Sequence, residues 1–285
     1  MYYLIYKQEL NAFCIVDTIV HQCEKYGMSP KIHLLKSSYE AMSLPQPDKD
    51  TPTIAFLLGR IKGYYTADYN CVYALTKAGL NIRFVTYAQP KQQVGSCQGL
   101  LLTGGDFAMP EKYYTDIRED MPEYPSVRSK ASVLCVHKAI RHHIPILGIG
   151  AGAQTVAGEF GLKICRDVAK LSNGQICHKS DEHNAHIVNL VPDTPFSKLM
   201  QGRTQLQVNS QHSGAVMIPP KKVAEKIGLD FYAFAPDGVP EAWGNEEKKI
   251  LCTQWHPEDY AVQQDDNMQR IFRWLADITD THWNS

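Results

Sequence analysis

Residues 144–154 have the layout of a buried strand that turns sharply into a helix, an arrangement that exposes a nucleophilic side chain above a sheet. Small residues at Gly148, Ala151 and Gly152 permit the tight turn that this layout requires. A cysteine at the centre would have its pKa lowered by the helix amino terminus and by a neighbouring histidine. Glycine occupies that centre, at Gly150, so the sequence lacks the nucleophile that its own layout predicts.

A second segment, Thr253–Glu258, supplies the other side chains of an acyl-transfer site. His256 has the chemistry of a general base, and Glu258 would hold the imidazole in the required tautomer and orientation. Backbone N–H groups would stabilise the oxyanion that forms during such a reaction. The residues that would donate them are Gly104, Gly105 and Ala151.

Strands and helices alternate in the part of the chain that must position these residues. Strands are predicted at 53–58, 82–86, 99–103 and 144–149, and helices at 67–78, 129–142, 152–160 and 267–277. Between 187 and 254 the predicted segments are short and β-like. The alternation predicts an α/β fold with a doubly wound, mostly parallel sheet. In such sheets the sites lie at the carboxyl ends of strands, which is where Gly104, Gly150 and His256 fall.

Residues 1–52 are predicted to be an N-terminal extension to an α/β domain of residues 53–285. Apolar residues recur at helical spacing between Leu10 and Tyr26, and 32–35 is a strand candidate. Prolines and aspartates between 45 and 52 indicate a linker. Core packing explains the apolar helix face, and a face that binds a protein partner is the alternative.

Composition and charge exclude several classes of function. The 285 residues, 44% of them hydrophobic and 21% charged, are enough for a full core and are typical of an enzyme-like chain. A net charge of −1 with dispersed basic residues leaves no patch for nucleic acid or for an anionic membrane. The apolar runs are too short to span a bilayer, and the first residues do not resemble a secretion signal. Eight cysteines without a CxxC pair indicate reduced thiols, so a cytoplasmic location is expected.

Five blocks together resemble the class I glutamine amidotransferase superfamily. They are Thr103–Asp106, Gly148–Gln154, Asn209–Ser213, Ala235–Glu241 and Gln254–Glu258, in the order and spacing of that family. Within it the chain is similar to the γ-glutamyl-peptidase branch, especially to γ-glutamyl-γ-aminobutyrate hydrolases. The resemblance implies a flavodoxin-like sheet, a small γ-glutamyl substrate and no cofactor.

The resemblance also implies roles for individual residues. The nucleophilic cysteine of the family falls on Gly150, its histidine on His256 and its glutamate on Glu258. The residues that would grip the α-amino and α-carboxylate groups of the substrate are Gln154, Asn209, Ser210, Gln211 and His212. The implied chemistry is attack of a thiolate on a γ-glutamyl amide, release of the amine and hydrolysis of the thioester.

The chain departs from this family at two places. Gly150 has no side chain, and Arg128–Ser132 stands where the branch often has Arg-Asp-x-x-Glu. Three explanations for Gly150 stay open: an engineered knockout, a natural pseudoenzyme that keeps its binding pocket, and a changed mechanism with another nucleophile.

Three functions are compatible with the sequence. The first is a hydrolase of γ-glutamyl amides or amines that lacks its nucleophile. The second is a non-catalytic protein that binds γ-glutamyl compounds or a protein partner, the latter through residues 1–52. The third, an amidotransferase subunit that supplies ammonia, is least favoured because the sequence shows no synthase domain. A homo-oligomer also stays open.

A group of histidines and one cysteine follows the helix after Gly150. Its members are Cys177, His178, His183 and His186, and such side chains can bind zinc. A structural role, or a place at the rim of the pocket, explains them better, so no metal is expected. Asp237 and Glu241 are either contacts to a substrate amine or an ordinary turn residue and strand carboxylate.

Overall fold

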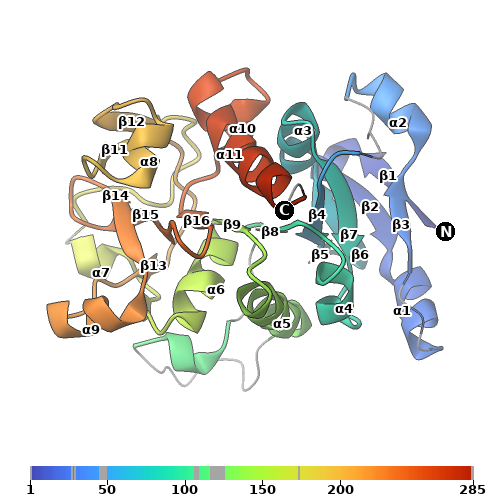
Figure 1. The fold of residues 1–285 in the computed structure, drawn as a ribbon, viewed down its shortest axis with the longest axis horizontal. Helices are drawn as coiled ribbons and strands as arrows, with labels where there is room; N and C mark the ends of the chain where they lie inside the picture. The colour runs from blue at the N-terminus through green and yellow to red at the C-terminus, as the bar shows by residue number, and fades with distance from the viewer. Residues whose placement is uncertain are drawn as a thin grey trace. The chain divides into compact units, whose positions relative to one another are not determined.

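The computed structural model describes residues 2–26, 28, 30–44, 50–105, 109–115, 126–172 and 174–283. The chain divides into two compact units, which are drawn together in Figure 1. The first unit comprises Met1–Leu101, His137–Pro145 and Glu258–Ser285, and the second comprises Leu102–Val136 and Ile146–Pro257. Each unit combines helices with β-sheet, so the predicted α/β class is confirmed.

The first unit contains a five-stranded sheet in the order β3-β1-β2-β6-β5. Its strands are β1 (Tyr2–Lys7), β2 (Ala12–Val16), β3 (Ile32–Leu34), β5 (Gly59–Ile61) and β6 (Tyr64–Asp68). The short elements beside them are η1 (Gln8–Leu10), α1 (Asp17–Lys25) and α2 (Lys36–Ala41). Because β2 pairs antiparallel with both β1 and β6, the N-terminal segment shares its sheet with strands that follow residue 52.

The helix predicted between Leu10 and Tyr26 is correct only in its second half. Ala12–Val16 is strand β2, and helix α1 begins at Asp17. β-Branched Ile15 and Val16 favour a strand, and the neighbours β1 and β6 supply hydrogen bonds to both edges of β2. The predicted linker residues 45–49 lie outside the described residues.

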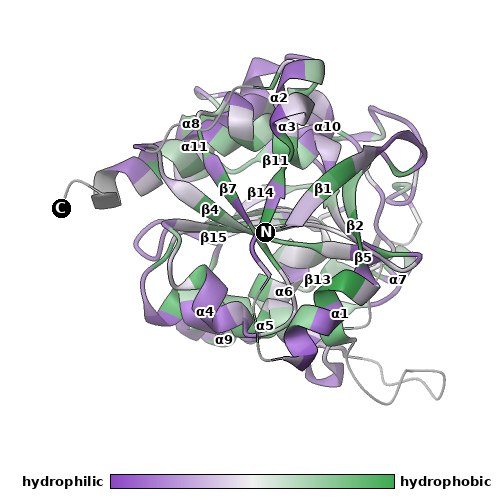
Figure 2. Cartoon of the chain, turned by 90° about the vertical axis from the view of Figure 1, so that its right-hand side faces the viewer, coloured by the Kyte–Doolittle hydropathy of each residue, from purple (hydrophilic) through white to green (hydrophobic). Residues whose placement is uncertain are grey.

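A set of parallel strands completes the first unit. Strand β4 (Thr53–Leu57) pairs in parallel with β7 (Asn81–Val85) and β8 (Gly99–Leu102). Helices α3 (Tyr69–Lys77) and α11 (Asp266–Trp283) cover one face of these strands, and α4 (Pro90–Val94) lies on the other (Figures 1 and 2). The short helix α10 (Glu258–Ala261) packs against α3 and α11. In Figure 2, α11 carries both hydrophobic and hydrophilic residues, and its buried face is the predicted one: Met268, Ile271, Phe272 and Leu275.

The second unit contains both parallel and antiparallel strands. Strand β9 (Ile146–Ile149) pairs in parallel with β16 (Ile250–Thr253). Antiparallel strands continue from β16 in the order β15 (Pro240–Asn245), β14 (Asp230–Phe234), β11 (His186–Leu190) and β12 (Gln205–Val208). Residues 235–239 and 246–249 are short connections, and a parallel neighbour would need a longer crossover.

The second unit also contains helices and a small second sheet. They are η2 (Glu111–Tyr113), the first part of α5 (Val127–Arg141), α6 (Ala151–Glu159), α7 (Ala169–Ser172), α8 (Pro195–Leu199), α9 (Lys221–Ile227) and the two-stranded sheet of β10 (Ile164–Cys165) and β13 (Ala215–Val216). Helix α6 contacts β9, β13 and β16. The predicted helices before and after the turn at residue 150 are therefore confirmed.

All eight cysteines are free thiols, as the sequence predicted. Within the described part of the chain, no helix combines the length and the apolar character needed to cross a bilayer.

We expect Phe13→Ala to destabilise the protein by about 3–5 kcal/mol, because the ring is fully buried. The ring packs against Tyr6 and Tyr69, at centroid distances of 5.5 and 6.1 Å. Urea unfolding followed by circular dichroism measures the change. The control Val16→Ala, on the same strand but 42% exposed, should cost less than about 1 kcal/mol. Equal small effects would show that residues 1–52 are a loosely attached appendage.

Candidate active site

The turn at Gly150 joins strand β9 to helix α6. Its N–H donates to the carbonyl oxygen of Thr253 at 2.9 Å, and its own carbonyl accepts from the N–H of Gln154 at 3.1 Å. The backbone at Gly150 has φ 55° and ψ −121°. This left-handed region favours glycine, because a Cβ atom there meets the neighbouring carbonyl. Any side chain at this position is therefore held in a strained backbone.

His256 faces the open side of this turn. A Cβ atom placed on Gly150 would lie 3.3 Å from Nε2 of His256 and 3.5 Å from its Cε1. The parallel pairing of β9 with β16 aligns Ile149 with Thr253, so the two strands end together. Gly150 is buried, whereas His256 is partly exposed. A side chain at residue 150 would thus start within reach of an imidazole that solvent also reaches.

Gly104 packs against the same imidazole. A Cβ atom on Gly104 would come within 2.7 Å of Cε1 of His256, closer than such atoms can approach. The Cα atom of Gly104 would also lie 3.3 Å from a Cβ atom at Gly150. Glycine at 104 therefore leaves room for the ring in this position, and residues 104, 150 and 256 meet at one point.

Arg128 holds the loop that contains Gly104. Its Nη2 donates to the carbonyl oxygens of Thr103, at 3.1 Å, and Gly104, at 2.7 Å. Because C=O and N–H point in opposite directions in a trans peptide, the N–H of Gly105 faces away from Arg128. That orientation suits a backbone donor to a substrate oxygen. In the sequence, Arg128 stands out only as part of the departure from the family, and Asp106 lies outside the described residues.

The side chain of Asn209 makes two hydrogen bonds to the backbone of His256. Its Oδ1 accepts from the N–H of His256 at 2.9 Å, and its Nδ2 donates to the carbonyl oxygen of His256 at 3.2 Å. Asn209 is 3% exposed, so this pair of bonds is shielded from water. The sequence assigned Asn209 to the substrate and missed this positioning role, because the two residues are 47 positions apart.

The amide of Gln154 also makes contacts within the protein. Its Nε2 donates to the carbonyl oxygen of Gly214 and to Oε1 of Gln254, both at 2.9 Å. Ala151, whose N–H is a predicted oxyanion donor, begins helix α6 and is half-buried. The first N–H groups of a helix have no partner within the helix, so this end of α6 favours a negative charge.

The predicted substrate segment after Asn209 has mixed exposure. Ser210 is fully buried, and its hydroxyl donates to the carbonyl oxygen of His178 at 2.8 Å. Gln211 is exposed. His212 is 7% exposed, and its Nε2 lies 3.3 Å from Oε1 of Glu241. Of these three side chains, that of Gln211 is the one most open to a ligand.

Glu258 begins helix α10 in the first unit and is 4% exposed. It lies near the thiol of Cys71, which also has Asp68 nearby. Burial raises the pKa of Cys71, and the carboxylates of Glu258, Asp68 and Asp259 raise it further. This thiol is therefore kept protonated and is not a nucleophile.

Other buried thiols do not replace the missing nucleophile either. Cys252 is fully buried in β16, and its burial raises its pKa. Cys97 is 6% exposed, and burial raises its pKa to about 11. A thiol reacts as its thiolate, so both are inert near neutral pH. These two residues give no support to a changed mechanism.

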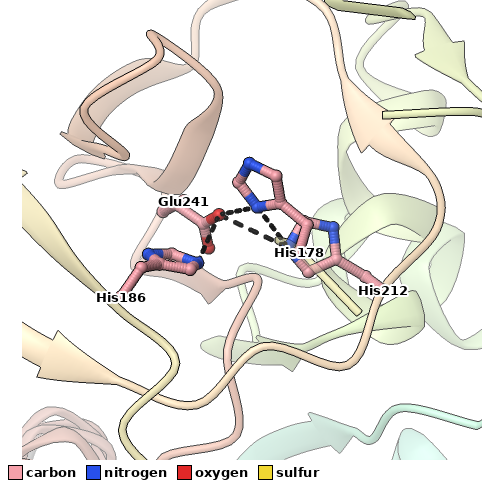
Figure 3. A group of neighbouring side chains, drawn as sticks. All are labelled: His178, His186, His212 and Glu241. Carbon is pink, nitrogen blue, oxygen red and sulfur yellow. Dashed lines mark hydrogen bonds and ion pairs between the residues drawn. The ribbon is translucent and has the colours of Figure 1, made fainter. Parts of the chain in front are cut away.

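Four buried side chains gather in the second unit, and none of them is a residue predicted for catalysis. They are His178, His186, His212 and Glu241, and Figure 3 shows the three imidazoles around the carboxylate. Burial alone would raise the pKa of Glu241, but the nearby histidines outweigh it and lower that pKa to about 2. Burial lowers the pKa of His178, yet Glu241 and Asp237 reverse the effect and raise it overall.

The sequence predicted only half of this group. His178 and His186 belong to it, whereas Cys177 and His183 are exposed. His212 and Glu241 join them through the tertiary fold. The signal available in the sequence was that both residues sit in the blocks on which the family resemblance rests.

We expect Gly150→Ala to lower the free energy of unfolding by about 1–3 kcal/mol, because the methyl group forces a disfavoured backbone and presses on Gly104 and His256. The control is Gly228→Ala, with φ 68° and open space around its Cβ position. It should cost about 1 kcal/mol. Chemical denaturation of both variants measures the difference. An equal or smaller loss at residue 150 would contradict the crowding described here.

Two curated proteins are similar to this chain in sequence. The glutamine amidotransferase-like protein YvdE of Lactococcus lactis is 28% identical over 163 residues, which is 56% of this chain and 65% of that protein. PB2B2.05 of Schizosaccharomyces pombe, named after glutamine amidotransferases, is 25% identical over 186 residues, 65% of this chain and 70% of that protein.

A solved structure shows the same fold. It is the glutaminase domain of Trypanosoma brucei CTPS with bound acivicin, which matches with a TM-score of 0.57 at 17% identity. The match covers 80% of this chain and 94% of that one. The Peptidase C26 family model matches residues 62–258, which include Gly104, Gly150, His256 and Glu258. The chain therefore belongs to the Peptidase C26 family.

Proposed function

We propose that this chain carries the site of a γ-glutamyl amide hydrolase whose nucleophile position is residue 150. With glycine there, the chain binds γ-glutamyl compounds without covalent turnover. The observation that carries the proposal is the 3.3 Å separation between a Cβ atom at Gly150 and Nε2 of His256. Family membership and the relatives named after glutamine amidotransferases support acyl chemistry at this place.

The proposed reaction begins when a thiol at residue 150 passes its proton to His256. The thiolate attacks the γ-carbonyl carbon, and the resulting oxyanion receives hydrogen bonds from the N–H groups of Gly105 and Ala151. His256 returns the proton to the departing amine, which leaves a thioester. His256 then takes a proton from water, which attacks the thioester and releases glutamate. In this scheme Glu258 orients the imidazole.

Several residues have positioning roles in the proposal. Asn209 fixes the backbone of His256, so the base does not depend on a partner at residue 150 for its place. Arg128 fixes the oxyanion loop through the carbonyl of Gly104. In the substrate segment, the exposed side chain of Gln211 contacts the ligand. The buried side chains of Ser210 and His212 hold the segment in place through contacts within the protein.

The alternative function is a non-catalytic binding protein whose site would not support turnover even with a thiol at residue 150. Its support is the backbone at Gly150, because glycine relieves strain of about 1–3 kcal/mol that a cysteine would impose there. Both functions predict ligand binding. They differ in what a restored thiol would do.

We expect Gly150→Cys to hydrolyse at least one compound from a panel of γ-glutamyl amines, γ-glutamyl peptides and glutamine. Adding His256→Ala to that variant should lower kcat by about 10²–10⁴-fold, because the thiol then loses its base. Adding Asn209→Ala should lower kcat by about tenfold or more while the thiol stays present, because a small displacement of the base is costly. Release of free amine measures turnover.

Gly150→Ala is the matched control, since it has a similar backbone strain but no sulfur. Both this variant and the unchanged chain should bind the ligands in calorimetry, and neither should release amine. A folded Gly150→Cys protein that binds ligand yet never turns it over would favour the binding-protein alternative. Absence of both binding and turnover would overturn the γ-glutamyl assignment.

A further inference from the structure

The group of His178, His186, His212 and Glu241, here called the histidine–glutamate cluster, has the spacing of ligands around a metal ion. Oxygen Oε1 of Glu241 lies 3.2 Å from Nδ1 of His178, 3.3 Å from Nε2 of His212 and 3.7 Å from Nε2 of His186. The two nitrogens of His178 and His212 are 3.3 Å apart. Ligands at 2.0–2.1 Å around a tetrahedral Zn²⁺ are about 3.3 Å from one another. The distances among His178, His212 and Glu241 match that value, and the distance from His186 to Glu241 is 0.4 Å longer.

The outer nitrogen of each imidazole is already engaged by an acceptor. Nε2 of His178 lies 3.0 Å from a carboxylate oxygen of Asp237. Nδ1 of His212 lies 2.9 Å from the carbonyl oxygen of Gly214. In His186, Nδ1 lies 3.0 Å from the carbonyl oxygen of Ile187. Carboxylates and carbonyls only accept, so each outer nitrogen must carry the hydrogen.

In a neutral ring, the inner nitrogen consequently carries a lone pair and no hydrogen. Three such nitrogens face one carboxylate oxygen, and all four atoms are acceptors within 4.8 Å of one another. Neither oxygen of Glu241 has a hydrogen bond among the described residues, and neither does Nε2 of His186. Four buried acceptors repel one another unless an additional proton or a metal ion lies between them.

The charge of the surroundings points to a divalent cation. The side chains of Glu241 and Asp237 are 0% and 1% exposed, so two carboxylates are buried beside three imidazoles. A divalent ion balances both negative charges. The contact from Asp237 to His178 is the outer-shell arrangement in which a carboxylate orients a metal-binding histidine.

We propose that the histidine–glutamate cluster is a binding site for a divalent transition metal, with Zn²⁺ as the best match. Imidazole and carboxylate ligands in a tetrahedron suit Zn²⁺, whereas Mg²⁺ and Ca²⁺ prefer oxygen ligands alone. Four protein ligands close the coordination shell, which is the pattern of a structural site. The proposal departs from the sequence expectation that the chain binds no metal.

The metal would tie together four separate segments of the second unit. His186 belongs to β11 and Glu241 to β15, while His178 and His212 lie in loops. His212 is three residues after Asn209, which grips the backbone of His256. The metal therefore anchors the segment that positions the base. It does not contact the reacting atoms in this proposal.

The test uses the full chain without an affinity tag of histidines. Elemental analysis of the purified protein, and titration of the chelated protein with Zn²⁺, should each give one ion per chain. Removing the metal should lower Tm by about 5–10 °C, and Zn²⁺ should restore it. Replacement by Co²⁺ should give the visible absorption of a tetrahedral cobalt site with nitrogen and oxygen ligands.

Variants separate this site from adventitious metal binding. Glu241→Gln and His186→Ala should each reduce bound metal at least tenfold, and Asp237→Asn should keep the stoichiometry but weaken affinity for Zn²⁺ by about 10–100-fold. The control His183→Ala removes an exposed histidine from the same loop region and should keep one ion. Where a ligand variant fails to fold, titration of the unchanged chain still decides the matter.

Two results would overturn the proposal. One is a folded, unchanged chain that holds less than about a tenth of an equivalent of metal and whose Tm does not respond to Zn²⁺ or Co²⁺. The cluster would then be held by protons alone. The other is full retention of metal in folded Glu241→Gln and His186→Ala, which would place the ion elsewhere.

Discussion

The sharp turn between β9 and α6 is the constraint on which the site depends. It forces residue 150 into a left-handed backbone, aims its Cβ direction at His256 and starts helix α6 at the next residue. The parallel pairing with β16 sets the distance. Gly104 leaves room for the ring in this geometry, because the imidazole occupies the space of its missing side chain.

The local part of this arrangement could be predicted from the sequence. The strand and helix around Gly150 follow from an apolar run, small residues and helix-forming residues that are neighbours in the chain. Strand β2 could not be predicted in the same way. Its apolar residues Phe13 and Val16 fit a helical period as well as a strand, and the deciding partners, β1 and β6, are invisible to a local pattern.

Long-range contacts decided the remaining roles. Asn209 and His212 were predicted as ligand contacts because they stand in a recognisable block, yet their side chains face His256 and Glu241. The cluster itself joins residues from four segments, and only His178 and His186 are close in sequence. The argument for a metal depends on the tautomers of the three histidines. Those tautomers follow from the positions of nearby carbonyl and carboxylate oxygens, which a sequence does not contain.

Asn209 holds His256 through main-chain atoms, so the backbone position of the base is fixed independently of the side chain at residue 150. The genetic code adds a consequence, since two glycine codons become cysteine codons by one change in the first base. Under the proposed function, a lineage built on this scaffold would lose or regain the nucleophile in a single mutational step. Selection could then switch such a gene between turnover and recognition without rebuilding its architecture.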